Sequence, residues 1–369
     1  MLPRASGVRL ALIAPAGVAM MLGLYAGLLL IGVPLPVLTD RLAEVHAPLL
    51  VFGFVGGLIS LERAVALRAI WAYSAPILLV AGAFVALSPA PHPAGPAIVM
   101  IGMAVHLAQY LAIWRRQAMT ATTVQTLGVI AGIAAALVWC AGVPVSSLVP
   151  LLAVFLVLTI AGERLELARV AIRGIRPERM LFSLALALVV AAVLGLSTPT
   201  IAVPFAGLFL LLTVAWLVRY DIARVTVTHA GLPRYVAICL LTGYGWLTVA
   251  GVGWVLGGAR TEGALYDATT HAVFLGFVIT MIMAHAPLIL PAVLQLSIPY
   301  HPALYAPAAL LHAGLIIRLV AGDAWGLPVA LPVGGAVSAG AIVLFAVTVV
   351  TLILRARRAP SKEVAGVAA

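Results

Sequence analysis

Residues 44–67 read EVHAPLLVFGFVGGLISLERAVAL, an apolar run with a histidine near its start and a Glu-Arg pair near its end. A helix of about 20 apolar residues is long enough to cross the hydrocarbon core of a bilayer. The rest of the 369-residue chain is similar, because 64% of it is hydrophobic, 9% is charged and the mean hydropathy is +1.21. A soluble domain carries about 25% charged residues. The composition therefore excludes a soluble enzyme, a secreted disulfide scaffold and a disordered chain, and it predicts an all-α polytopic membrane protein.

Hydropathy along the chain predicts twelve membrane-spanning helices, separated by proline, glycine or charged residues. The loops between them are too short for a soluble domain, so we expect a single transmembrane domain over residues 1–369. The predicted spans are 8–31, 46–67, 71–89, 96–114, 121–140, 147–167, 180–197, 200–218, 234–257, 268–291, 302–320 and 328–354.

The distribution of basic residues predicts the orientation. With the N-terminus inside, 18 of the 21 Lys and Arg residues fall on inner segments, and only Arg41, Arg260 and Arg318 fall on the other side. Basic residues accumulate on the cytoplasmic side of membrane proteins. We therefore expect a multi-pass protein of the bacterial inner membrane with both termini cytoplasmic, in contact with lipid. The net charge of +10 then reflects orientation, and nucleic acid is not an expected partner.

Three of the predicted spans share a pattern in which a phenylalanine precedes a polar residue by eight positions. Relative to the second span, the sixth repeats the Phe, the Glu-Arg pair and a final Arg at an offset of 101 residues. The tenth span repeats the Phe and has a histidine at the position of the Glu. This pattern predicts three pseudo-repeated units of four helices, at about 1–117, 118–233 and 234–369. The matching segments are FVGGLISLERAVALR from Phe54, FLVLTIAGERLELAR from Phe155 and FVITMIMAHAPLILP from Phe277.

Two histidines open the second and tenth spans at similar depth near the outer face. His46 and His271 are a candidate pair of haem ligands, because imidazole is a common axial ligand and a helix bundle can hold a porphyrin. Arg41 and Arg318 would then bind the propionates by charge-assisted hydrogen bonds. The repeat aligns His46 with Thr269, however, so it does not by itself direct both histidines at one centre. The alternative is that the two histidines only cap helices at the interface.

A second set of ionisable residues lies toward the inner ends of the spans. If the repeat holds, Glu62, Glu163 and His285 lie on adjacent helices, where they would bind a divalent cation or relay protons. A secondary transporter would use such a site. The alternative is that Glu62-Arg63 and Glu163-Arg164 are neighbouring opposite charges at the cytoplasmic interface, where arginine side chains extend toward water.

Methionine and histidine also occur together in two spans, and thioether plus imidazole ligands suit Cu(I). A copper-handling membrane protein is therefore a further alternative, although methionine is also an ordinary packing residue. His312, in the outer half of the eleventh span, is another candidate metal ligand. The residues of the two groups are Met100, Met103 and His106, and Met281, Met283 and His285.

Several catalytic and cofactor motifs are missing from the sequence. There is no P-loop, no GxSxG, no HExxH and no CxxCH, so phosphoryl transfer, serine hydrolysis and covalent haem attachment have no support. Cys140 and Cys239 lie in apolar runs and form neither a disulfide framework nor a metal-ligand spacing. The first apolar run is long enough to span and lacks a clear cleavage site, so no cleavable signal peptide is expected. Catalytic residues are not assigned, and whether the protein is an enzyme stays open.

The two spans that begin with these histidines resemble a known family. EVHAPLLVFGFVGGLISLERAVAL (44–67) and THAVFLGFVITMIMAHAPLILPAVL (270–294) are similar to the NnrS family, haem- and copper-associated membrane proteins linked to nitric oxide and denitrification. The predicted twelve-helix architecture also resembles subunit I of the haem-copper oxidases. The resemblance implies that His46 and His271 bind haem b, and that Arg318 lies where the oxidases bind propionates.

The sequence also departs from the oxidases. The sixth and seventh spans contain no histidine, and the tenth lacks a paired His-x-His, so an oxygen-reducing copper centre and a second haem have no ligands here. The resemblance therefore implies one haem, with copper as an option, in a protein that serves electron transfer, nitric oxide sensing or protection against nitrosative stress. A redox partner protein would supply or accept the electrons.

Overall fold

The computed structural model is all-helical, and it describes residues 3–169, 172, 174–294 and 298–358. Within these residues, twelve helical segments are long and apolar enough to cross a membrane. Their ends lie within four residues of the predicted ones; the tenth, for example, begins at Ala264 and not at residue 268. The predicted all-α fold with twelve spans is therefore confirmed, and the protein is a multi-pass membrane protein.

The spans follow one another with short connections, and four of them contain more than one type of helix. The first six are formed by α1 (Pro3–Leu30); α2 (His46–Pro48), η1 (Leu49–Gly56) and α3 (Gly57–Leu67); η2 (Ile70–Tyr73) and α4 (Ser74–Leu87); α5 (Ala94–Arg116); α6 (Thr120–Cys140); and α7 (Val145–Ala168). The next three are α8 (Arg176–Leu194), α9 (Pro199–Tyr220) and α11 (Leu232–Gly257), with the short α10 (Ala223–Thr226) between the last two. The final three are α12 (Ala264–His271), η3 (Ala272–Ile279) and α13 (Thr280–Leu294); η4 (Pro302–Leu304), α14 (Tyr305–Ile316) and η5 (Ile317–Ala324); and α15 (Ala330–Arg358).

The second, sixth and tenth spans form the centre of the bundle. Buried residues make up 61%, 78% and 67% of their most apolar windows, whereas no other span exceeds 50%. These three spans also contact one another: Phe52 stacks on Phe155 with ring centroids 6.5 Å apart, α7 contacts η3, and α13 contacts α3. The central helices are the same three that share the Phe pattern in the sequence.

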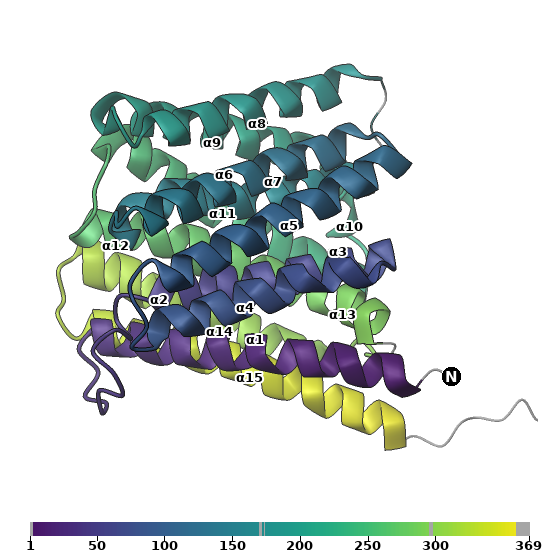
Figure 1. Cartoon of the computed structure of the whole chain (residues 1–369), viewed down its shortest axis with the longest axis horizontal. Helices are drawn as coiled ribbons and strands as arrows, with labels where there is room; N and C mark the ends of the chain where they lie inside the picture. The colour runs from purple at the N-terminus through teal and green to yellow at the C-terminus, as the bar shows by residue number, and fades with distance from the viewer. Residues whose placement is uncertain (1–2, 170–171, 173, 295–297, 359–369) are drawn as a thin grey trace, which may run out of the picture.

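The remaining spans surround this centre, and the first and last of them pack together. In Figure 1, α1 and α15 run side by side at one edge of the bundle, and the start of α1 and the end of α15 lie at the same end of it. We call this the termini end and the opposite one the far end. An even number of spans requires this arrangement, which agrees with the prediction that both termini lie on one side of the membrane.

Three of the spans contain an eight-residue π-helical segment, namely η1, η3 and η5. Such segments are rare and occur often at functional sites. Segment η1 begins at residue 49 and η3 at residue 272, a difference of 223, which is also the spacing of Phe54 and Phe277. The second and tenth spans therefore correspond in backbone as well as in sequence. α7 has no such segment, and the division into three repeated units stays a prediction.

Close helix contacts in the bundle depend on glycine, and Gly95 is a sensitive example. A Cβ atom at this position would lie 2.5 Å from the backbone nitrogen and 2.6 Å from the Cα of Ala86. We predict that Gly95→Ala destabilises the protein by about 1–3 kcal/mol, because α4 and α5 must separate. Thermal unfolding in detergent would show this as a lower midpoint. Gly245→Ala is the matched control, since a Cβ there meets nothing within 4 Å. An equal midpoint for both variants would contradict the prediction.

Candidate functional sites at the two ends of the bundle

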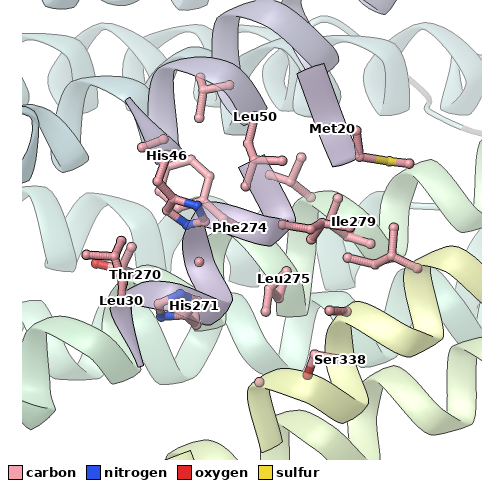
Figure 2. Close-up of a pocket in the computed structure, with 18 of the residues that line it drawn as sticks. Met20, Leu30, His46, Leu50, Thr270, His271, Phe274, Leu275, Ile279 and Ser338 are labelled. Atoms are coloured by element: carbon pink, nitrogen blue, oxygen red, sulfur yellow. The ribbon is translucent and has the colours of Figure 1, made fainter. Parts of the chain in front are cut away.

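His46 and His271 line one cavity near the far end, between the first, second, tenth and twelfth spans (Figure 2). The cavity has a volume of about 180 Å³, and the empty space that includes its mouth is about 1180 Å³. Each histidine lies near the start of a π-helical segment. His271 directly precedes η3, and His46 lies three residues before η1. The structure thus brings together the two histidines that the sequence paired, although the repeat aligns them two residues apart.

His46 is held by the first span. Its Nδ1–H donates a hydrogen bond of 2.6 Å to the carbonyl oxygen of Gly23. One turn further along α1, Gly27 has no side chain, and a Cβ there would lie 2.7 Å from Cε1 of the imidazole. The ring therefore lies close against the backbone of α1. Because a carbonyl oxygen only accepts, Nδ1 carries the proton, and Nε2 is left with a lone pair.

His271 is held from within its own span. Its Nδ1–H donates to the carbonyl oxygen of Asp267 at 2.8 Å and lies 3.2 Å from the Oδ1 atom of the same residue. Arg318 on η5 binds the Asp267 carboxylate through Nε and Nη2, at 2.8 and 2.7 Å. This bidentate pair fixes the carboxylate behind the imidazole. His271 therefore also presents Nε2 as its unprotonated nitrogen.

The lining of the cavity is mainly apolar, with a few polar atoms that lack partners. Thr270 Oγ1 and Ser338 Oγ are buried and make no hydrogen bond within the described residues, and both residues line the cavity. Buried polar atoms are nearly always paired with protein, water or ligand. An apolar pocket with a few convergent polar groups is the usual form of a cofactor site. The apolar side chains include Leu24, Leu28, Leu50, Val51, Phe54, Phe274, Leu275, Val278 and Ile342.

The two arginines that the sequence assigned to this site are placed differently. Arg318 lines the cavity, although two of its nitrogens are bound to Asp267. Arg41 is not among the lining residues; its Nη1 donates to the carbonyl oxygens of Ser88 and Ala90 at 2.7 and 2.5 Å. Within the described residues, Arg41 therefore ties the connection after α1 to the end of α4.

A second group of polar residues lies toward the termini end, where Arg63 joins Glu62 to Glu163. Nη2 of Arg63 lies 3.1 Å from Oε1 of Glu62 and 3.0 Å from Oε1 of Glu163, and all three side chains are mostly buried. The guanidinium also lies 5.7 Å from the ring centroid of Tyr110. Arg63 Nε and the Tyr110 hydroxyl are buried and have no hydrogen-bond partner within the described residues. One guanidinium is thus shared by two carboxylates.

Arg164 forms a separate ion pair close by. It binds the two carboxylate oxygens of Asp221 at 2.7 and 2.8 Å, and the Arg164 and Asp221 side chains are only 3% and 1% exposed. The hydroxyl of Tyr244 donates to the same carboxylate at 2.5 Å, and Nη1 of Arg164 lies 3.3 Å from Nε2 of His285. Both arginines are buried, so they do not extend toward water as the alternative interpretation from sequence expected. The carboxylates of Glu62 and Glu163 meet at Arg63, whereas His285 contacts Arg164.

The other candidate metal ligands lie apart. His106 Nδ1 donates to Oε1 of Gln109 at 2.6 Å, and Nδ1 of His312 accepts the indole N–H of Trp246 at 3.0 Å. Nδ1 of His285 donates to the carbonyl oxygen of Met281 at 2.7 Å. Among the residues that the structure describes, His, Cys, Asp and Glu form no group of three or more that would hold a metal ion.

Comparison with known proteins gives a family but no function. A family model described as a domain of unknown function, DUF8744, matches residues 9–354. The chain belongs to this family. No curated protein and no solved structure matches the chain. The family spans nearly all of the twelve-helix bundle, so it includes both polar sites.

Sequence reasoning missed three residues of these sites. Asp267 was not singled out, although its position four residues before His271 on a helix places both on one face. Asp221 follows directly after a span, and no periodicity relates it to Arg164, which is 57 residues away. Tyr110 stands one turn after His106 in an apolar helix and could have been noted as a buried hydroxyl.

The pair of Asp221 with Arg164 predicts a pH-dependent contribution to stability. Burial alone would raise the pKa of Asp221, but hydrogen bonds from Arg164, Tyr244 and the Ala223 amide hold this pKa below its usual range. A carboxyl with a lowered pKa in the folded state stabilises above the unfolded pKa of about 3.9, and this stabilisation is lost as the pH falls through the folded pKa.

We therefore predict that Asp221→Asn lowers stability at pH 7 by about 3–5 kcal/mol, because it leaves a buried guanidinium without its partner. Thermal unfolding from pH 7 downward is the measurement, and the difference from wild type should shrink below about pH 4. Asp40→Asn is the control, since Asp40 is exposed and forms no ion pair within the described residues. A difference that stays constant with pH would contradict the assignment.

Proposed function

We propose that this protein binds one b-type haem in the far-end cavity, with His46 and His271 as the two axial ligands. The observation that carries the proposal is that both histidines line one cavity while their Nδ1 atoms are committed to backbone carbonyls. Metal-ligating histidines almost always donate their second ring N–H to a carbonyl or carboxylate, which fixes the ring and its tautomer. Both Nε2 atoms are therefore left as potential ligands.

The remaining features of the cavity agree with the binding of a haem. Its walls are mainly apolar, as a porphyrin ring requires, and Thr270 and Ser338 supply polar atoms that lack partners in the described residues. Arg318 also lines the cavity, and its Nη1, which does not bind Asp267, would donate to an anionic substituent. When bound, a haem with two histidine ligands supplies one-electron oxidation and reduction at iron, which favours electron transfer over bond-making chemistry.

The resemblance to the NnrS family extends this proposal to a biological role. On that basis, the haem would serve nitric oxide-linked redox chemistry or protection against nitrosative stress, with a redox partner protein in or at the bacterial inner membrane. Copper is not included in the proposal. The candidate copper ligands His106, His285 and His312 lie on α5, α13 and α14, and within the described residues His, Cys, Asp and Glu form no group of three or more that would hold a metal ion.

We predict that His46→Ala and His271→Ala each lower the bound haem at least tenfold, since each removes one axial ligand. A dithionite-reduced minus oxidised visible spectrum of the purified protein, with a pyridine haemochrome assay, measures the haem and its type. His312→Ala is the matched control, because it removes a partly buried histidine that bonds to Trp246 outside the cavity. A flat spectrum from wild-type protein expressed with ample haem, or full haem in the double variant, would overturn the proposal.

The Arg63 cluster supports a second candidate function, a proton or ion pathway at the termini end. With both carboxylates ionised, Glu62, Glu163 and Arg63 would carry a net charge of −1 in a mostly buried site. An uncompensated buried charge is costly, so a proton or a cation is expected to offset it. The Tyr110 hydroxyl and Arg63 Nε are buried without a hydrogen-bond partner in the described residues, so a bound water would satisfy them.

For this function we predict that Glu62→Gln and Glu163→Gln each reduce proton flux at least tenfold in proteoliposomes energised by a potassium diffusion potential. A pH-sensitive dye inside the vesicles reports the flux. Glu166→Gln is the control, since Glu166 lies on the same helix as Glu163 but is exposed. Flux no higher than in protein-free vesicles, or equal flux in all variants, would rule out the pathway. Haem content should be unchanged in each of these variants.

A further inference from the structure

A second cavity lies at the termini end, where it shares only Asp221 with the polar groups described above. It is bounded by Ile172, the first turn of α8, the end of α9 and the short α10, and its volume is about 300 Å³. Arg219, Tyr220 and Asp221 line it from the end of α9, Arg224 lines it from α10, and Pro177 lines it from α8. Neither the haem proposal nor the proton pathway uses this cavity.

The charge of this cavity is positive. Within the described residues, Arg219 and Arg224 form no ion pair, whereas five other ion-pair contacts are found. The Arg219 guanidinium lies 5.3 Å from the ring centroid of Tyr220, an arrangement that orients it. Asp221 contributes little opposing charge, because its carboxylate is bound to Arg164, to the Tyr244 hydroxyl and to a backbone amide. Two guanidinium groups therefore remain available to an anion.

The position and shape of the cavity indicate what kind of anion would enter. Arg219 is the second-last residue of a membrane span, so the cavity lies at the boundary between hydrocarbon and water. Its other lining residues, Ile172, Ile222 and Val225, are apolar. The first turn of α8 lies beside it and contributes Pro177 to the lining. Cationic groups next to apolar surface suit an amphipathic anion.

We propose that this cavity binds a phosphate group through Arg219 and Arg224, and that the phosphate belongs to an anionic phospholipid. Arginine binds phosphate oxygens in a bidentate manner. Basic pockets between transmembrane helices on the cytoplasmic side bind lipid headgroups in this way. The distribution of basic residues predicts that the termini end is that side. Trp216, whose indole N–H donates to the carbonyl oxygen of Pro177 at 2.9 Å, holds the wall of the cavity in place.

The test uses the full-length protein in phosphatidylcholine nanodiscs that contain phosphatidylglycerol. Native mass spectrometry of the released protein counts the phosphatidylglycerol molecules that stay bound. Each arginine near an anionic headgroup is worth about fivefold in affinity, so the Arg219→Gln/Arg224→Gln double variant should reduce retention about 10- to 30-fold. Arg219→Lys/Arg224→Lys keeps both charges and should retain most of the lipid. Arg355→Gln/Arg357→Gln is the matched control, because it removes two exposed positive charges from α15 at the same end.

Each result distinguishes a specific site from general attraction. Loss of lipid in the Arg219→Gln/Arg224→Gln variant alone supports the proposal. Equal loss in the Arg355→Gln/Arg357→Gln control would show that general surface charge holds the lipid, and this result would overturn the proposal. Unchanged lipid retention in both double variants would also overturn it. Inorganic phosphate is added in a separate arm; if it displaces the lipid only from protein with Arg219 and Arg224 intact, the shared phosphate chemistry is supported. Thermal unfolding and haem content of all variants report folding and the far-end site independently.

Discussion

The absence of a hydrophobic driving force between helices in lipid is the constraint on which this structure depends. Lipid tails are as apolar as leucine, so transmembrane helices associate through close packing and hydrogen bonds. Glycines make such packing possible: a Cβ at Gly128 on α6 would lie 2.8 Å from a carbonyl oxygen of α7, and one at Gly95 would meet the backbone of α4. Close contacts of this kind enclose the second, sixth and tenth spans. Polar residues on these three spans are therefore removed from lipid.

The central position of these spans explains where the polar residues can be placed. The middle of the core is filled by aromatic and aliphatic side chains, such as the stack of Phe52 with Phe155 and Trp139. The ion pairs among the described residues are found toward the two ends. The pairs Arg318–Asp267 and Arg164–Asp221 are both bidentate, and a third arginine, Arg63, is shared by two carboxylates. At the far end, the π-helical segment η3 begins directly after His271, and η1 begins three residues after His46.

Much of the fold was predictable because hydropathy measures directly what a bilayer requires. The twelve spans and the shared side of both termini follow from apolar runs of sufficient length and from the spacing of basic residues. His46 and His271, which were paired by their similar depth, line one cavity, although the repeat by itself does not direct both at one centre. The long-range ion pairs were not predictable, because they depend on tertiary contacts between residues far apart in the chain. No local pattern indicates that Arg63 would bridge two spans.

The two polar sites share one helix, which limits how strongly they can influence each other. His271 and His285 stand 14 residues apart on the tenth span, about 21 Å along a regular helix. At that distance, and with an effective dielectric constant of about 20, two unit charges interact by about 0.8 kcal/mol. A change of charge at the termini end would therefore alter an equilibrium at the far end by only about fourfold. Any stronger coupling would have to come from movement of the tenth span itself, and its π-helical segment η3, between the two histidines, is where the regular helix is already interrupted.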